Sequence, residues 1–353
     1  MVRYIGSARI RALLTRQGAA SFLEGLAREI ERDYRRWNEF EKSARLASHS
    51  RDGVIELMPI SDGRLYAFKY VNGHPKNTAN RLLTVTAFGA LADVATGYPL
   101  LLSEMTVVTA LRTAAVSALA ARGMARPDSR VMAVVGNGAQ SEFQALAFHQ
   151  LLGIRELRLY DTDGNATQKL QGNLAALRLP GLTVTCCTST AEAVRGADII
   201  TTATADKRNA TIVTPEMVVP GMHLNAIGGD CPGKTELHVD ILRRPDARIV
   251  VEFEPQARIE GEIQQLEPGA EVIELSDVLS GRQPGRRKRA DVTIFDSVGF
   301  ALNDFSALCY LQRLDSAQSD SESLDLIPSL EDPKNLFAAL REPARQPRLA
   351  GVA

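Results

Sequence analysis

Two glycines and an acid have the spacing of a dinucleotide-binding site. Gly136 and Gly138 lie in VVGNGAQSEF after an apolar run, and Asp161 ends a second run, ELRLYD, 25 positions after the first glycine. In such a site the glycines let the backbone approach a pyrophosphate at a helix N-terminus, and the acid accepts the ribose hydroxyls. Ser141 replaces the third glycine, and no arginine follows the acid, so the pattern favours NAD over NADP. An ordinary glycine turn in an α/β core is the alternative.

Charged side chains inside apolar segments form a second group of candidates. Arg112 is the one charge in VVTALRTAAVSALAA, Lys69 shares a strand face with apolar residues in YAFKYV, and Glu56 interrupts VIELM. Burying a charge costs several kcal/mol unless an opposite charge pairs with it. A substrate carboxylate would pair with the cations, and an acid would receive an ammonium. Structural ion pairs, a snorkelling arginine and solvent-facing strand positions are the alternatives.

Asp230 is the candidate for acid–base catalysis. It follows an apolar run and two glycines in NAIGGDCPGKTEL, with Lys234 four residues on. Open α/β sheets bind ligands at the carboxyl ends of their strands, where this acid would lie. A capped Asp-Cys-Pro-Gly turn is the alternative. The sequence around Arg45, KSARLASHS, gives almost no indication that this residue has a functional role. Three cations and Glu56 near one site would nevertheless suit a zwitterionic substrate that resembles a diamino acid.

The elements that must position these residues alternate between strands and helices after Pro127. A strand at Val131–Val135 and a helix at Ala139–Leu152 flank the glycines, and Glu156–Asp161 is the next strand. The later strands are expected at Thr183–Cys187, Asp198–Thr204, His223–Ile227, Ala247–Glu252 and Val292–Ser297. This alternation predicts a parallel sheet.

The first third of the chain has a different pattern. An amphipathic helix is predicted from about residue 20 to 40, and a long Ala-rich helix at Thr106–Arg122. Strands are expected between them, at Gly53–Ile60, Leu65–Asn72, Leu82–Asp93 and Tyr98–Ser103. Their close spacing without helices predicts an antiparallel or mixed sheet. The polar tail beyond about residue 316 is expected to run back over this part.

Composition limits the possible partners. The 353 residues contain 41 Lys and Arg against 42 Asp and Glu. The chain therefore lacks the net positive charge that is typical of proteins that bind nucleic acids or acidic membranes. The one basic cluster, Arg286–Arg289, is predicted to be a solvated loop. Four cysteines and five histidines show neither a disulfide framework nor zinc-ligand spacing, so no metal is expected. No signal-peptide pattern or run of 18 apolar residues is found, so we expect a cytoplasmic protein.

Several segments together resemble the ornithine cyclodeaminase/μ-crystallin family. They are SEMTVVTALRTAA, VVGNGAQSEFQALA, HLNAIGGDCPGKTEL, RIEGEIQQL and FDSVGFAL, and RLASHSRDGVIELMPI and YAFKYVNGHP extend the similarity to the N-terminal half. KYVNGHP and GGDCPGKTEL are most similar to the bacterial ornithine cyclodeaminase branch. The resemblance implies a homodimer whose N-terminal sheets pack together across the two-fold axis, with NAD bound by each Rossmann domain.

The resemblance also assigns roles to residues. Asp230 matches the catalytic acid/base. The positions that match substrate contacts are Arg45, Lys69, Arg112, Val298 and, less directly, Glu56. Those that match dinucleotide contacts are Thr84, Arg112, Ala139, Gln140, Asp161, Thr204, Lys234 and Ser297, in addition to the glycines Gly136 and Gly138. The implied reaction removes a hydride from Cα of L-ornithine, closes the ring with loss of ammonia, and returns the hydride to give L-proline.

The expected fold class is therefore α/β, with a Rossmann-type NAD-binding domain and an α+β substrate-binding and dimerisation domain. The expected boundaries are 1–113, completed by 320–353, for the substrate domain, and 114–319 for the Rossmann domain. Other functions stay open within this fold. They are a lysine cyclodeaminase that forms L-pipecolate, an NAD(P)H-dependent cyclic imine reductase or amino-acid dehydrogenase, and a crystallin-like binding or structural protein.

Overall fold

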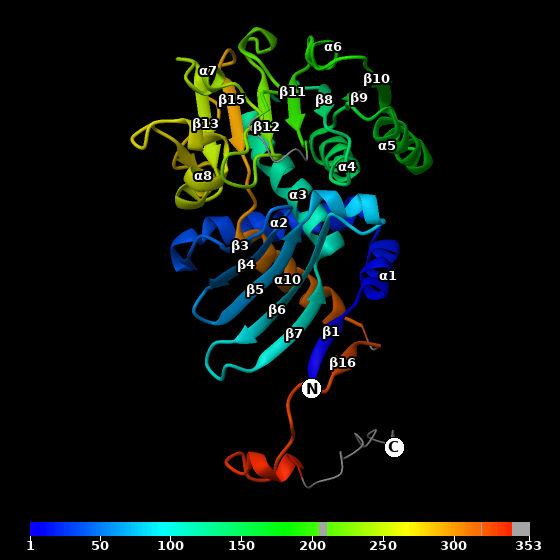
Figure 1. Ribbon diagram of the computed structural model, residues 1–353, viewed down its shortest axis with the longest axis vertical. Helices are drawn as coiled ribbons and strands as arrows, with labels where there is room; N and C mark the ends of the chain where they lie inside the picture. Colours follow the sequence, from blue (N-terminus) through cyan, green and yellow to red (C-terminus); the bar gives the residue numbers. More distant parts are fainter. Residues whose placement is uncertain (205–209, 319, 341–353) are drawn as a thin grey trace.

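The computed structural model describes residues 1–204, 210–318 and 320–340. Two sheets dominate the molecule, a mixed sheet built mainly from the N-terminal part and a parallel sheet built from the second half of the chain (Figure 1). Helix α3 (Thr106–Met124) connects them in the sequence and lies between them in the view. The α/β class and both sheets agree with the prediction from the sequence.

The N-terminal sheet has the strand order β16-β1-β7-β6-β5-β4-β2, and β3 also pairs with β4. Its strands are β1 (Val2–Ile5), β2 (Glu41–Lys42), β3 (Leu46–His49), β4 (Val54–Ser61), β5 (Leu65–Gly73), β6 (Val85–Asp93), β7 (Pro99–Glu104) and β16 (Glu322–Leu324). Strand β1 runs parallel to β7, and the other pairs are antiparallel. The sheet is therefore mixed, as expected. Strand β16 returns the C-terminal segment to β1, which confirms part of the expectation for the tail.

One face of this sheet is covered by helices and the other carries exposed apolar side chains. Along β4, Glu56 and Met58 are buried while Ile55 and Leu57 are exposed. Helices α10 (Ala301–Ser316) and α3 contact the sheet, and α2 (Ala19–Arg35) and α1 (Ser7–Gln17) pack on these helices in turn. Helix α10 packs against α2 and β5, although it comes from the segment 114–319 that we assign to the Rossmann domain. The two parts of the chain thus share one helical layer.

The second sheet is parallel throughout, in the order β10-β9-β8-β11-β12-β15-β13-β14. Its strands are β8 (Val131–Val135), β9 (Glu156–Tyr160), β10 (Thr183–Cys186), β11 (Ile199–Thr202), β12 (His223–Ala226), β13 (Ala247–Val251), β14 (Ile273–Glu274) and β15 (Val292–Asp296). The flanking helices are α4 (Ser141–Leu152), α5 (Gly164–Leu177), α6 (Thr190–Val194), α7 (Val239–Leu242), α8 (Glu254–Glu260) and α9 (Leu275–Leu279). The strand order reverses between β8 and β11, which is where such sheets bind ligands.

Short 3₁₀ helices complete the described chain, at Trp37–Glu39, Pro75–Asn80, Pro215–Met217, Glu262–Gln265 and Leu336–Leu340. The predicted helix from about 20 to 40 is therefore α2 followed by the first of these turns. Among the described helices, none is long and apolar enough to cross a membrane. None of the four cysteines, all of them among the described residues, forms a disulfide bond.

The basic cluster is only partly the solvated loop that the sequence predicts. The Arg286 guanidinium donates hydrogen bonds to the carbonyls of Met124 (2.8 Å) and Met222 (3.1 Å) and to Thr293 Oγ1 (3.0 Å). Arg289 instead forms an exposed ion pair with Asp128. Arg286 therefore ties the end of α3 to the parallel sheet, because a planar guanidinium can serve several carbonyls at once.

Candidate functional site

The glycine loop leaves room for a ligand. Gly136 has φ +89°, and a Cβ there would lie 2.6 Å from the Ala203 carbonyl oxygen, so only glycine fits. Ser141 is buried and donates from Oγ to the Gly136 carbonyl (2.7 Å), which joins the start of α4 closely to the strand. Gly138 and Ala139 are exposed, and a Cβ on Gly138 would meet nothing within 4 Å. The loop therefore presents open backbone at the N-terminus of a 12-residue helix.

Asp161 lies beside this loop, at the carboxyl end of β9. Its Oδ2 accepts a hydrogen bond from the Asn137 amide (2.5 Å), and its Oδ1 accepts one from the Asp163 amide (2.8 Å). The Asn137 side chain is itself fixed by Thr167 Oγ1 (2.8 Å). The acid and the glycine loop are thus held together, as an acid that binds an adenosine ribose requires.

The remaining predicted dinucleotide residues differ in their surroundings. Thr204 donates from its amide (2.7 Å) and its Oγ1 (2.6 Å) to Glu236 Oε1, at the end of β11. Gln140 Nε2 donates to the Ala110 carbonyl of α3 (3.0 Å). Thr84 instead lies just before β6 of the N-terminal sheet, where its carbonyl accepts a hydrogen bond from the His74 amide (2.8 Å). Ser297 follows β15, and its Oγ contacts Glu252 Oε2 at 3.3 Å.

Asp230 and Lys234 form an ion pair after β12. Lys234 Nζ lies 3.1 Å from Asp230 Oδ1; the lysine side chain is 5% exposed, whereas that of the aspartate is 57% exposed. Burial lowers the pKa of Lys234, but the charges of Asp230 and Glu236 outweigh it and raise the pKa overall. The lysine is therefore a cation that holds one oxygen of Asp230, and the acid faces open space from which a substrate can approach.

The buried cations Lys69 and Arg112 lie around one acid that the sequence reasoning missed, Asp304 of α10. Lys69 Nζ is 2.8 Å from Asp304 Oδ2, and Arg112 Nε is 3.0 Å from Oδ1. Burial, together with the charge of Arg112, lowers the pKa of Lys69 to about 7, although Asp304 opposes part of this shift. Within the described chain, Arg112 Nε and Nη1 have no hydrogen-bond acceptor. Two cations against one carboxylate suit a bound anion.

Arg45 has the opposite surroundings, because two carboxylates flank it. Its Nη1 lies 2.9 Å from Glu56 Oε2, and its Nε lies 3.1 Å from Glu260 Oε2. Its Nη2 donates to the carbonyls of Val298 and Gly299. Each of the three charged side chains is less than a tenth exposed. The structure therefore brings Arg45, Glu56 and Val298 together, as the sequence predicts, and adds Glu260.

Two acids of the site that we did not predict could have been found in the sequence, Asp304 as a lone charge and Glu260 through a segment that resembles the family. Asp304 is the one charge in FALNDFSALCYL, the same pattern that identified Arg112, and Glu260 lies within RIEGEIQQL. Glu252 is fully buried after β13 and accepts hydrogen bonds from the Gly299 amide (2.6 Å) and Asn303 Nδ2 (2.6 Å). Burial raises its pKa, and Arg112 opposes part of this shift. Glu252 therefore holds the loop beneath Arg112.

These residues converge because strands of the parallel sheet end at one edge. In Figure 1 the arrowheads of β11 and β15 point toward the N-terminal sheet, whose inner face carries Lys69 and Glu56. The open loop at Gly138 and the acid at the end of β9 fit a dinucleotide, and the groups on the facing sheet fit a small charged substrate. Among the described residues, no group of three or more histidines, cysteines or acids is placed to hold a metal ion.

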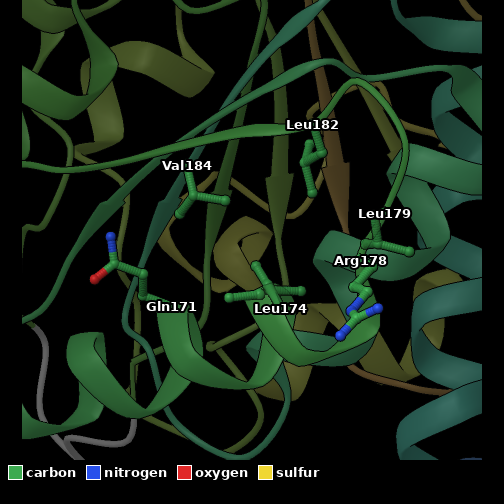
Figure 2. Close-up of a pocket in the computed structure, with 7 residues that line it drawn as sticks. Gln171, Leu174, Arg178, Leu179, Leu182 and Val184 are labelled. Carbon is green, nitrogen blue, oxygen red and sulfur yellow. The ribbon is translucent and has the colours of Figure 1, made fainter.

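A hollow on the outer edge of the parallel sheet is a different feature. Figure 2 shows it between α5 and β10, lined by Gln171, Leu174, Ala175, Arg178, Leu179, Leu182 and Val184. None of the predicted site residues lines it. Its one charge, on Arg178, has no acid or base beside it in the lining, so this hollow does not provide catalytic groups.

Comparison with known proteins identifies the family of this chain. The sequence pattern that describes the ornithine cyclodeaminase/mu-crystallin family matches residues 12–319. The chain belongs to this family. It is 56% identical over 351 residues to an ornithine cyclodeaminase of Agrobacterium fabrum, a match that covers 99% of this chain and 98% of that protein. An L-lysine cyclodeaminase of Streptomyces rapamycinicus is 34% identical over 72% of this chain and 74% of its own length.

Solved structures of the family share the fold. A lysine cyclodeaminase described as recognising L-lysine, L-ornithine and L-2,4-diaminobutyric acid superposes with a TM-score of 0.89 at 26% identity, over 96% of this chain and 99% of that one. An archaeal alanine dehydrogenase dimer with bound NAD gives a TM-score of 0.82 at 27% identity, over 92% and 99%. The Rossmann-type architecture with a second domain thus agrees with the prediction.

Proposed function

We propose that this family member is an NAD-dependent ornithine cyclodeaminase, which converts L-ornithine into L-proline and ammonia without net oxidation. The observation that carries the proposal is the polarity of the site. Two buried cations, Lys69 and Arg112, share one carboxylate at one end, while Arg45 lies between two carboxylates at the other. A diamino acid presents the complementary charges. The 56% identity to an ornithine cyclodeaminase over nearly the whole chain supports the same substrate.

NAD is the cofactor of this reaction, and when bound it supplies a group that accepts a hydride from the substrate and returns it. Gly136 and Gly138 would hold the pyrophosphate at the start of α4, and Asp161 would hold the ribose hydroxyls. The further contacts that we propose are Thr84, Arg112, Ala139, Gln140, Thr204, Lys234 and Ser297. The open backbone at Gly138 supports this assignment.

Lys69 and Arg112 would bind the substrate carboxylate, because both are buried and Arg112 has unpartnered donors among the described residues. Arg45 is proposed to assist them, with Val298 packing against the substrate chain. The Val298 carbonyl already contacts Arg45. Pinning the carboxylate fixes Cα relative to the cofactor and keeps the chain curled for ring closure, which supplies the proximity contribution to the rate.

Asp230 would take a proton from the α-ammonium, since only a neutral amine has the lone pair that allows Cα to lose a hydride. The ion pair with Lys234 leaves the second carboxylate oxygen of Asp230 for the substrate. Asp230 would later return the proton during the loss of ammonia, as a general acid.

The test is an assay of purified protein with L-ornithine and a small amount of NAD. Formation of equal amounts of proline and ammonia over many turnovers per NAD is expected. L-lysine is the second substrate to assay, because the solved lysine cyclodeaminase is described as recognising both diamino acids. Higher kcat/KM for lysine, with L-pipecolate as the product, would reassign the substrate. Net reduction or oxidation of nicotinamide would indicate a dehydrogenase or a cyclic imine reductase. Absence of any turnover would indicate a crystallin-like binding protein.

We also propose that the protein is a homodimer joined through the exposed face of the N-terminal sheet. Leu57, Tyr66 and Phe88 are each more than a third exposed on neighbouring strands, and Tyr70 stacks on Phe88 with ring centroids 5.0 Å apart. An apolar face of this kind is typical of a buried interface. The related alanine dehydrogenase was solved as a dimer. A dimer mass by light scattering that falls to a monomer mass in Phe88→Asp would support this.

The domain division and the location remain proposals. Residues 1–113 with 320–353 would form the substrate and dimerisation domain, and 114–319 the Rossmann domain, with α10 reaching across to the first. A cytoplasmic location is supported by the four free thiols, which persist in a reducing compartment. Tracking a tagged protein in fractionated cells would test it.

A further inference from the structure

The acidic end of the site contains more carboxylates than cations. Glu56, Glu260 and Asp230 are three carboxylates, and among the described residues Arg45 and Lys234 are the cations that pair with them. The charges of Asp230 and Glu56 both act on Glu260 and repel its negative charge. A bound cation would relieve this imbalance.

Within the described part of the chain, Glu260 is the member of this group that has a buried carboxylate oxygen without a hydrogen bond. Its residue is 5% exposed, and among the described residues no donor makes a hydrogen bond to its buried Oε2. Arg45 Nε lies 3.1 Å away but is too poorly aligned to serve it, and this Nε is itself unpartnered. Glu56, by contrast, accepts a hydrogen bond from Arg45 Nη1. A buried acceptor without a hydrogen bond is unfavourable, so a ligand donor at Glu260 Oε2 would be favoured.

The position of Glu260 relative to the carboxylate site suits a short diamino acid. Glu56 pairs across the strands with Val71, and Met58 pairs with Lys69, so Glu56 and Lys69 are diagonal neighbours on one face. Such neighbours have Cα atoms about 7–8 Å apart. Arg45 connects Glu56 to Glu260, and the Glu260 carbonyl lies 3.9 Å from where a Cβ on Gly229 would be, next to Asp230. The three acids therefore lie together around Arg45, beside the strand position that carries Lys69.

We propose that Glu260 binds the distal ammonium of the diamino acid and accepts one of its protons. This inference rests on the proposed cyclodeaminase function and assigns a residue to the end of the substrate that must cyclise. The transfer converts the ammonium and the carboxylate into a neutral amine and a carboxylic acid. The amine lone pair then forms the new C–N bond to Cα of the imino acid, and a proton passes from the ring nitrogen to the original nitrogen. The bond from Cα to the original nitrogen then breaks with loss of ammonia. The proton leaves with the expelled ammonia as ammonium, which restores the Glu260 carboxylate.

The protonation behaviour of the group agrees with this role. Burial raises the pKa of Glu260 to about 7, with Arg45 opposing the shift and Glu56 and Asp230 adding to it. A carboxyl group with a pKa near neutrality exchanges protons in both directions at neutral pH, as a general acid–base group must.

The decisive experiment compares two ligands that differ only at the distal amine. L-norvaline has the carbon chain of ornithine without that amine. Binding of each is measured by calorimetry to enzyme loaded with NADH, in which the amino acid cannot be oxidised. In Glu260→Gln we expect ornithine affinity to fall about tenfold or more, as for a lost charge-assisted hydrogen bond, and norvaline affinity to stay within about twofold. Equal losses for both ligands, or no loss for ornithine, would overturn the proposal.

A kinetic arm tests the proton transfer. In a single-turnover experiment, ornithine is mixed with NAD-loaded Glu260→Gln. Reduced nicotinamide is expected to accumulate, because oxidation at Cα proceeds while ring closure is slow. Proline formation should fall by about 10²–10⁴-fold, the usual loss for a general base. Impaired nicotinamide reduction with no accumulation would contradict the assignment. The binding comparison needs no turnover, so a wild-type enzyme that makes no proline would reject the proposed function without deciding the role of Glu260.

Two further variants distinguish a role of Glu260 in catalysis from a purely structural role. Glu267→Gln makes the same change at an exposed position nearby and should leave binding and turnover unchanged. Glu260→Asp keeps a carboxylate and should recover at least about tenfold of the proline formation that Glu260→Gln loses. Thermal unfolding is measured for each variant. If both changes at Glu260 prevented folding, or if the aspartate recovered nothing, Glu260 would be a structural partner of Arg45 and the proposal would fail.

Discussion

Lys69 and Asp304 form a fully buried ion pair between the N-terminal sheet and α10. The Lys69 Nζ and Asp304 Oδ2 atoms are 2.8 Å apart, and the two side chains are 1% and 2% exposed. The residues are 235 positions apart in the chain, so the pair forms only when α10 packs on the sheet. Because Arg112 contacts the same carboxylate, this one acid sets the geometry of both cations.

Asp304→Asn should therefore destabilise the protein. The substitution removes the carboxylate that Lys69 and Arg112 share, and removing one member of a buried pair costs about 3–5 kcal/mol. Urea unfolding at neutral pH measures the loss, with the exposed Asp325→Asn as the matched control. The double variant Lys69→Met with Asp304→Asn should recover part of the stability. A loss below about 1 kcal/mol in the single variant would mean that the pair is not the main support of the two cations.

Asp230→Asn should abolish most turnover without loss of the cofactor. The amide keeps the shape of the side chain but cannot accept a proton, so kcat should fall about 10²–10⁴-fold. NAD affinity, measured by titration of protein fluorescence, should change little. Asp240→Asn, at a 63% exposed side chain ten residues on, is the matched control. Near-normal kcat in Asp230→Asn would leave this acid as a turn residue and reject the mechanism.

Lone charges in apolar segments were the most productive signal in the sequence. Arg112 and Lys69 lie in segments that are otherwise apolar, which predicts that they are buried, and the structure buries both. Asp304 has the same signature in its helix, so the rule would have found it. Arg45 and Glu260 carry no such signal, because each lies among other polar residues and becomes buried only through contacts that are distant in the sequence.

The cofactor preference is a third test. Asp161 lies beside the glycine loop, and its negative charge should repel a 2′-phosphate on the adenosine ribose. NADP should therefore support ornithine turnover much less well than NAD when each is supplied at the same concentration. The measurement is the rate of proline formation with each cofactor. Comparable activation by NADP would overturn the assignment of Asp161 to the ribose.

The pH dependence of stability should reveal Asp296, which lies under the site at the end of β15. Burial raises its pKa to about 7, although backbone amides of Glu262 and Ile263 oppose the shift. Between 3.8, its ordinary value, and about 7 the folded protein retains a proton that the unfolded chain releases. This group therefore lowers the free energy of unfolding as pH rises through that window, and has no further effect above it.

The side chain introduced by Asp296→Asn does not ionise. Comparison with this variant therefore isolates the contribution of Asp296 to the pH dependence of the free energy of unfolding. The free energy of unfolding of the wild type minus that of the variant should be larger at about pH 5 than at about pH 8. Urea unfolding of both proteins at the two pH values gives the difference. The buried acids Glu252 and Glu262 are present in both proteins, and the part of the Glu262 pKa shift that the Asp296 charge causes belongs to the measured Asp296 contribution. A difference that is constant with pH would show that Asp296 is ionised throughout.

The strands of both sheets could be predicted to within a few residues, because buried strands are short apolar runs between turn residues. Several elements could not. Strand β1 gains its pairing only through β7, about a hundred residues later, and through β16 near the other end of the chain. The position of α10 depends likewise on packing against α2. Contacts between distant segments also decide which sheet a helix covers, and local periodicity carries no information on that.

The last prediction tests the fate of the hydrogen on Cα. L-ornithine deuterated at Cα should yield L-proline that retains the deuterium at that position, as measured by mass spectrometry of the product. The physical reason is that the hydride leaves and returns within one enclosed complex, while Lys69 and Arg112 hold the carboxylate and prevent Cα from moving away. An elimination or a Schiff-base route would exchange the position with water instead. The control is the reverse experiment, unlabelled ornithine in deuterated water, which should leave Cα of proline free of deuterium. Proline that loses its label to solvent would reject the redox-neutral mechanism, even if ornithine is consumed and ammonia is released.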